Sequence, residues 1–208
     1  MFLLQELKCM MIQMLVTNPL SYFRVIVILI ASICLHELAH GVAALSQGDN
    51  TPRRSGHMTL NPVTHMGVES IFFLCMCGIA WGAMPVNPNN FRSRQWGDFI
   101  VSAAGPCLNL ILAIISIVAI KISQQSSFLS YDFFFLAALV NLNLFLFNCL
   151  PIPPLDGFYM FSKFFPKLKR LELGNFGALA MVIIMFSGIG SLLSVISGSI
   201  IRFGLNSF

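Results

Sequence analysis

The chain has 208 residues, of which 57% are hydrophobic and only 10% are charged, so its composition departs strongly from that of a soluble domain. A soluble domain of this length could not bury so much apolar surface, and we therefore expect a lipid bilayer as its solvent. The net charge of +4 is small, which excludes the basic footprint of a nucleic-acid-binding protein.

Five apolar segments follow one another along the chain, and each approaches or exceeds the roughly 20 residues that a membrane helix needs. Residues 1–20, which precede them, are interrupted by Glu6 and Lys8 and show no signal-peptide cleavage site. We expect this stretch to lie as an amphipathic helix in the membrane interface. The apolar segments are residues 21–45, 68–86, 99–120, 131–155 and 176–203.

The first apolar segment contains the motif H-E-x-x-H at residues 36–40. Residues four apart share one face of a helix, so His36 and His40 can bind the same zinc ion. Glu37 is adjacent to them and can act as general base on a zinc-activated water. Ionisable residues are expensive inside a membrane helix and indicate a functional site, and a metal would offset that cost.

A catalytic zinc ion usually takes three protein ligands, so a third is expected on another segment. Asp156 is the acidic residue at a comparable place, at the end of the fourth apolar segment. The prolines at 151, 153 and 154 prevent a regular helix just before it, and irregular backbone at membrane depth is tolerated where it lines a cavity. Taken alone, Asp156 is equally a turn residue before Gly157; beside H-E-x-x-H, the ligand interpretation is favoured.

The metal site also predicts the topology. His40 and Asp156 both lie near the C-terminal ends of their segments, so the two segments must run parallel to bring these residues to one depth. Two apolar segments lie between them, so one of the two should not cross the membrane. We expect this to be 68–86, because glycines interrupt it and prolines end it.

Four motifs in this order resemble the site-2 protease family of intramembrane zinc metalloproteases. Besides H-E-x-x-H and L-D-G, the stretch SAAGPCLNL at 102–110 is similar to the family's A-G-P-x-x-N motif. NCLPIPPLDG at 148–157 matches its N-x-x-P-x-P-x-x-D-G pattern. The stretches TLNPVTHMG, PVNPNNFRS and RQWGD resemble the compact bacterial branch, which lacks a PDZ domain.

The resemblance implies roles for individual residues. His36, His40 and Asp156 would be the zinc ligands, and Glu37 would be the catalytic base and acid. Asn148 and Asn109 would contact the substrate or the transition state, although hydrogen bonding between helices is an equally good interpretation of Asn109. His57 and His65 lie in a polar loop, and we do not expect them to be ligands.

The predicted fold is an all-α polytopic membrane protein with about four to five transmembrane helices and a re-entrant or β-strand-containing loop near the active site. We expect one transmembrane metalloprotease domain over 1–208, with a catalytic core at 21–175 and a C-terminal transmembrane helix at 176–208.

The predicted activity is zinc-dependent hydrolysis of transmembrane or membrane-proximal protein substrates, in a prokaryotic cell membrane or an organelle inner membrane. Lipid is the other expected partner; nucleic acid and an organic cofactor are not expected. The alternatives are a non-catalytic or metal-carrying membrane protein of the same fold. A carrier should show internal repeats, which the sequence lacks, and a non-catalytic relative typically loses the glutamate or a ligand.

Overall fold

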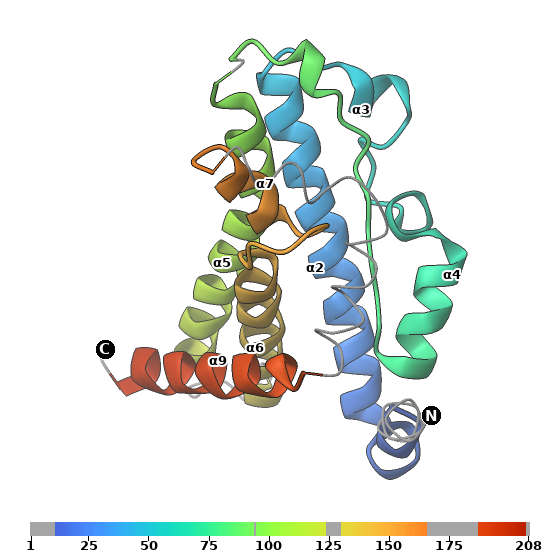
Figure 1. Cartoon of the computed structure of the whole chain (residues 1–208). Helices are drawn as coiled ribbons and strands as arrows, with labels where there is room; N and C mark the ends of the chain where they lie inside the picture. The colour runs from blue at the N-terminus through green and yellow to red at the C-terminus, as the bar shows by residue number, and fades with distance from the viewer. Residues whose placement is uncertain (1–10, 94, 124–129, 166–186, 207–208) are drawn as a thin grey trace.

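The computed structural model describes residues 11–93, 95–123, 130–165 and 187–206 (Figure 1). Within these ranges the regular elements are helices and there is no strand. Residues 11–17 are helical and precede α2; residues 1–10, the rest of the predicted interfacial helix, lie outside the described ranges. The elements are α2 (Pro19–Ser46), α3 (Thr51–Arg54), α4 (Pro62–Cys77), the 3-10 turn η1 (Pro88–Asn90), α5 (Gly97–Ser123), α6 (Tyr131–Asn148), α7 (Asp156–Ser162) and α9 (Ile189–Asn206).

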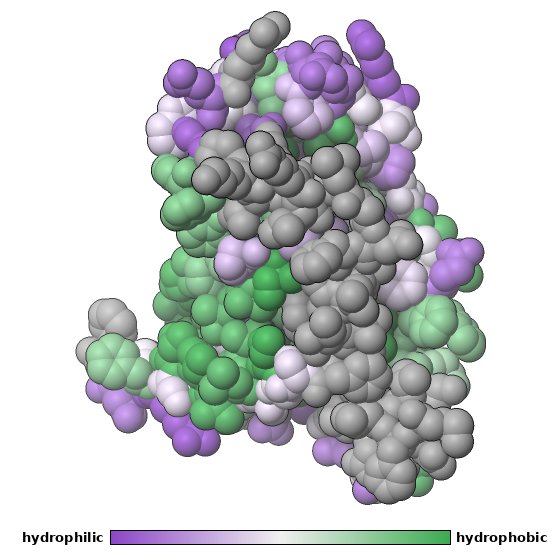
Figure 2. All heavy atoms as spheres, viewed as in Figure 1, coloured by the Kyte–Doolittle hydropathy of each residue, from purple (hydrophilic) through white to green (hydrophobic). Residues whose placement is uncertain are grey.

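Among the described residues, four helices are long and apolar enough to cross a membrane: α2, α5, α6 and α9. The helix α4 is apolar but shorter. Figure 2 shows hydrophobic residues over the middle and lower part of one face and hydrophilic residues at the upper end, where α3 lies. The protein is therefore an all-α polytopic membrane protein, as the composition predicts.

The local sequence explains where α2 and α4 begin and end. Each starts with proline after an asparagine whose side chain accepts a backbone N–H: Asn18 from Ser21, and Asn61 from Val63. The helix α4 ends at Gly78, which adopts the left-handed conformation (φ 72°) that favours glycine. The two helices pack through an apolar cluster that includes Tyr22 and Leu74.

The helix α5 packs against α2, α6 and α7 and forms the centre of the bundle. An apolar cluster joins α5 and α6 to α9; its buried members are Ala113, Ile120, Ala138, Leu142 and Ile201. In Figure 1, α9 runs across α5 and α6 rather than alongside them. The first part of the predicted C-terminal helix, residues 176–186, lies outside the described ranges.

The helices α2 and α6 ascend in Figure 1 and α5 descends between them in sequence, so α2 and α6 run parallel, as predicted from the metal site. The predicted fourth segment, 131–155, is helical only to Asn148, because the prolines that follow cannot continue the helix. The segment 68–86 divides into the end of α4 and an irregular stretch after Gly78. That stretch extends beside α2 (Figure 1) and lines the cavity described below.

Candidate active site

The helix α2 presents His36, Glu37 and His40 inside the bundle, where each residue is 7% exposed. His36 and His40 are one helical turn apart, and their ring centroids lie 4.7 Å from each other. Their Nε2 atoms face each other at 3.0 Å. Two imidazoles and a carboxylate therefore stand side by side in an apolar environment.

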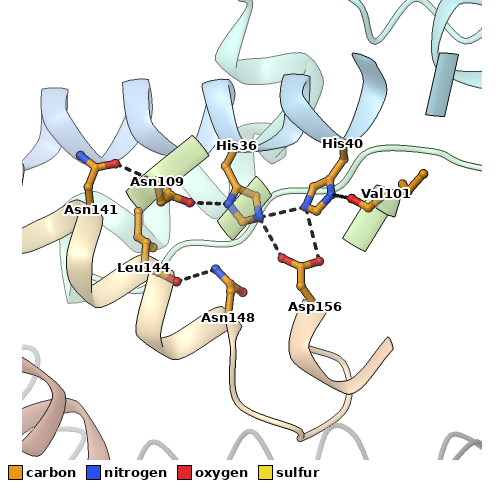
Figure 3. Close-up of polar contacts among 8 residues, drawn as sticks. All are labelled: His36, His40, Val101, Asn109, Asn141, Leu144, Asn148 and Asp156. Atoms are coloured by element: carbon orange, nitrogen blue, oxygen red, sulfur yellow. Dashed lines mark hydrogen bonds and ion pairs between the residues drawn. The ribbon is translucent and has the colours of Figure 1, made fainter. Parts of the chain in front are cut away.

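Asp156 reaches these histidines from the start of α7, 120 residues after His36 in the chain (Figure 3). Its Oδ2 lies 3.0 Å from His36 Nε2, and its Oδ1 lies 3.4 Å from His40 Nε2. The chain folds back tightly between α6 and α7, since a Cβ on Gly157 would collide with the carbonyl oxygens of Cys149 and Leu150. The proline-rich stretch between α6 and α7 thus carries the Asp156 carboxylate to the histidines.

The outer nitrogen of each imidazole faces an acceptor. His40 Nδ1 lies 2.7 Å from the carbonyl oxygen of Val101, and His36 Nδ1 contacts Oδ1 of Asn109 (Figure 3). A carbonyl oxygen only accepts, so Nδ1 of His40 carries a proton, and in the neutral ring its Nε2 presents a lone pair. Two neutral Nε2 atoms and a carboxylate that converge in this way repel one another unless a proton or a metal cation lies between them.

The three donor groups suit a metal ion in number, chemistry and spacing. Ligand atoms of His36, His40 and Asp156 all lie within 4.8 Å of one another. Two imidazoles and a carboxylate form a ligand set that catalytic zinc sites use. Gly105 faces the same point: a Cβ there would lie too close to both Nε2 atoms for real contact. His36, His40 and Asp156 could thus hold a metal ion at this point.

Glu37 borders this space from the same helix. A Cβ on Gly82 would lie 2.7 Å from its Oε1, so the carboxylate rests directly against the backbone of the irregular stretch after α4. Both residues line a cavity of about 720 Å³, large enough for several residues of a peptide. The three candidate ligands line the same cavity, together with Met84, Asn148 and Tyr159.

The two asparagines of the sequence analysis have different surroundings. Asn148 lines the cavity, and its Nδ2 donates to the carbonyl oxygen of Leu144 at 3.1 Å. Asn109 is fully buried between His36 and Asn141. Its amide is engaged on both sides, an arrangement that favours orientation of His36 over the predicted contact with the substrate.

His57 and His65 form hydrogen bonds with residues other than the three candidate ligands. His57 Nδ1 contacts Ser55, and His65 Nε2 donates to the carbonyl oxygen of Thr59 at 2.6 Å. Among the described residues, the metal-ligand group includes neither.

Asp49, at the end of α2, is a residue that sequence reasoning missed. It is fully buried, and its carboxylate accepts hydrogen bonds from Thr51, from the backbone N–H of Asn87 and from Nδ2 of Asn90. Burial by itself would raise the pKa of Asp49, but these donors outweigh burial and lower it. The sequence offered a weak signal, an acid in a Gly-Asp-Asn turn.

An all-α membrane protein whose H-E-x-x-H helix meets a carboxylate from a later helix belongs to the class of membrane metalloproteases. Residues 24–131 and 116–190 match peptidase family M50, and the chain belongs to this family, the site-2 proteases. The resemblance read from the motifs is thereby confirmed.

Curated relatives agree with this assignment. "Putative zinc metalloprotease YwhC" of Bacillus subtilis is 34% identical over 186 residues, which cover 83% of this chain and 85% of the relative. "Putative zinc metalloprotease Rip2" of Mycolicibacterium smegmatis is 34% identical over 155 residues, and the protein of that name in Mycobacterium tuberculosis is 32% identical over 153. These two alignments cover 68% of this chain and 58% of each Rip2 protein. No solved structure gives a significant match. Together with the four apolar helices, the family and its bacterial relatives show that the protein is an integral multi-pass protein of a prokaryotic membrane.

Proposed function

We propose that this protein is an intramembrane zinc metalloendopeptidase that hydrolyses peptide bonds of transmembrane or membrane-proximal proteins. The observation that carries the proposal is the convergence of His36, His40 and Asp156 beside Glu37, on a cavity inside an apolar bundle. A buried acid next to a metal-binding group is the arrangement that hydrolysis of an amide requires.

In this proposal His36 and His40 would hold zinc through their imidazole nitrogens, and Asp156 would hold it through its carboxylate. The outward hydrogen bonds of both Nδ1 atoms hold the rings in the orientation that this requires. Bound zinc would supply a Lewis acid that lowers the pKa of a water molecule and polarises the scissile carbonyl.

Glu37 moves the proton. Its carboxylate accepts a proton from the attacking water while the water oxygen forms a bond to the substrate carbonyl carbon. Glu37 then returns that proton to the amine nitrogen as the C–N bond breaks. Glycine at position 82 gives this carboxylate its place, because a Cβ there would collide with it.

Asn148 is proposed to stabilise the developing oxyanion. Its Nδ2 has two hydrogens, and the bond to Leu144 uses one of them. The second N–H can donate to a substrate oxygen in the cavity that Asn148 lines.

A transmembrane substrate must unwind before cleavage, because the carbonyl groups of a helix are hydrogen-bonded and shielded. The stretch after Gly78 offers it a partner. Backbone N–H groups of Trp81 and Ala83 point toward α4, where they donate to Ser70 Oγ and to the carbonyl oxygen of His65. Amides alternate in direction along an extended chain, so those of Gly82 and Met84 point to the cavity side. An extended substrate could add there as a strand.

The test is cleavage of a model transmembrane peptide by the purified protein in liposomes, with zinc removed by a chelator and then restored. We expect cleavage to stop on removal and to return with added zinc but not with magnesium, whose preference for oxygen ligands does not match two imidazoles.

Cleavage that persists in zinc-free protein would contradict the proposal. Tight zinc binding without cleavage of any transmembrane peptide would favour a non-catalytic relative. Zinc passing across the liposome membrane would favour a carrier.

A further inference from the structure

A line of side-chain hydrogen bonds crosses three helices and ends at His36. Asn141 on α6 donates through Nδ2 to the carbonyl oxygen of Ala137 at 2.9 Å. Its Oδ1 accepts from Nδ2 of Asn109 on α5 at 2.9 Å, and Oδ1 of Asn109 faces Nδ1 of His36 on α2 (Figure 3). The three helices therefore meet in one continuous polar contact.

The carbonyl oxygen of Ala137, at the end of the line opposite His36, determines which group donates and which accepts in each hydrogen bond. The carbonyl oxygen of Ala137 only accepts, so the NH₂ group of Asn141 must face it, and Oδ1 of Asn141 must face Asn109. That oxygen in turn requires the NH₂ group of Asn109, which leaves Oδ1 of Asn109 for His36. His36 is then protonated at Nδ1, and in the neutral ring Nε2 presents a lone pair toward Asp156 and His40.

The burial of these two amides indicates that their hydrogen bonds have a role. Asn109 is fully buried and Asn141 is 3% exposed, in helices built mainly of apolar residues. Buried amides are costly where they are not satisfied. An apolar residue at position 141 would avoid the free-energy cost of burying a polar group. It would, however, leave the amide of Asn109 free to rotate.

We propose that Asn141 is a positioning residue: through Asn109 it fixes the tautomer and ring orientation of His36. This inference rests on the proposed function in so far as His36 is a zinc ligand. The tautomer itself exists without zinc, so the inference can be tested separately.

The first test measures zinc affinity by competition with a chelating dye. We expect Asn141→Leu to bind zinc 10–100-fold more weakly than the wild type, the usual cost of losing such an outer partner. Asn143→Leu is the matched control on the same helix, since Asn143 bonds Ser194 and Ser197 of α9 instead. We expect the control to retain the affinity of the wild type.

A double-mutant cycle separates positioning from packing. If Asn141 acts through Asn109, the substitution Asn141→Leu should cost much less affinity in an Asn109→Leu background than in the wild type. An equal loss in both backgrounds, or wild-type affinity in Asn141→Leu, would overturn the inference.

A second measurement needs no variant and so does not depend on folding of Asn141→Leu. Nitrogen-15 NMR of histidine-labelled, zinc-free protein reports which ring nitrogen of His36 is protonated. We expect a proton on Nδ1, whether or not Nε2 also carries one. A His36 without a proton on Nδ1 would overturn the inference, whether or not the protein is later found to bind zinc or to cleave peptides.

Discussion

At the scale of single residues, the metal site depends on an absent side chain as much as on those present. Gly105 lies where the two Nε2 atoms converge, and any side chain there would occupy the space between them. The A-G-P-x-x-N motif contains this glycine, but nothing in the sequence alone says what the glycine faces. That depends on how α5 packs against α2.

We predict that Gly105→Ala abolishes zinc binding although alanine is the better helix former. The added Cβ would overlap both imidazoles, so zinc affinity should fall at least about 100-fold, more than for loss of an outer hydrogen-bond partner. The measurement is zinc content after equilibration in a zinc buffer. The matched control is Gly198→Ala in α9, where a Cβ would meet nothing within 4 Å. Gly105→Ala protein with a full zinc complement would contradict this view of the site.

Residues with ionisable side chains could be predicted from the sequence. Residues whose role depends on their neighbours in the folded protein could not. Ionisable groups in or next to the apolar segments are few, so His36, Glu37, His40 and Asp156 stood out, and the structure brings them together around one cavity. Asn109 was an amide with two reasonable roles. Only its neighbours, His36 and Asn141, show that it is fully engaged inside the bundle.

At the scale of elements, Asp49 joins the turn after α2 to residues 87–90, which follow the irregular stretch that lines the cavity. It accepts backbone N–H groups of Thr51 and Asn87 and side-chain groups of Thr51 and Asn90. The backbone N–H of Arg92 donates to Gln47 beside it at 2.7 Å. The stretch that lines the cavity is thus anchored to the helix that carries the histidines.

Asp49 therefore predicts a pH dependence of stability. Its pKa in the folded protein is below the ordinary value of 3.8, so its stabilisation is fully present above that value and is lost as pH falls through the folded pKa. Asp49→Asn should cost about 1.5–3 kcal/mol at neutral pH, the scale of a hydrogen bond to a charged group. It should also remove this acid-dependent loss.

Thermal unfolding between pH 2 and pH 7, followed by tryptophan fluorescence, measures both effects. The exposed Glu69 offers a control, because Glu69→Gln should leave the stability and its pH profile unchanged. An Asp49→Asn protein as stable as the wild type at pH 7 would show that Asp49 does not anchor this segment.

The direction of the helices could be predicted, whereas the detail of the loop between them could not. Parallel α2 and α6 follow from the need to bring His40 and Asp156 to one depth. Whether the stretch after Gly78 forms a strand depends on a pairing partner. Within the described residues, the amides of Trp81 and Ala83 instead donate to Ser70 and to the backbone of His65.

At the scale of the whole molecule, the bundle holds a polar reaction site within an apolar protein. At 1.5 Å per residue, His36 lies about 15 Å from the end of α2 at Ser46, well inside the helix. A cavity of about 720 Å³ lies beside it. In the proposed mechanism, water and an unwound substrate segment would meet in this cavity.

The most direct test of this account is the rate of cleavage of a model transmembrane peptide by Glu37→Gln protein at full zinc occupancy, compared with the wild type. Glutamine keeps the size of the side chain and the three ligands but cannot take up the proton. We predict unchanged zinc content and a rate lower by a factor of at least about 100, the contribution expected of a general base. Zinc-loaded Glu37→Gln protein that cleaves at the wild-type rate would contradict the account.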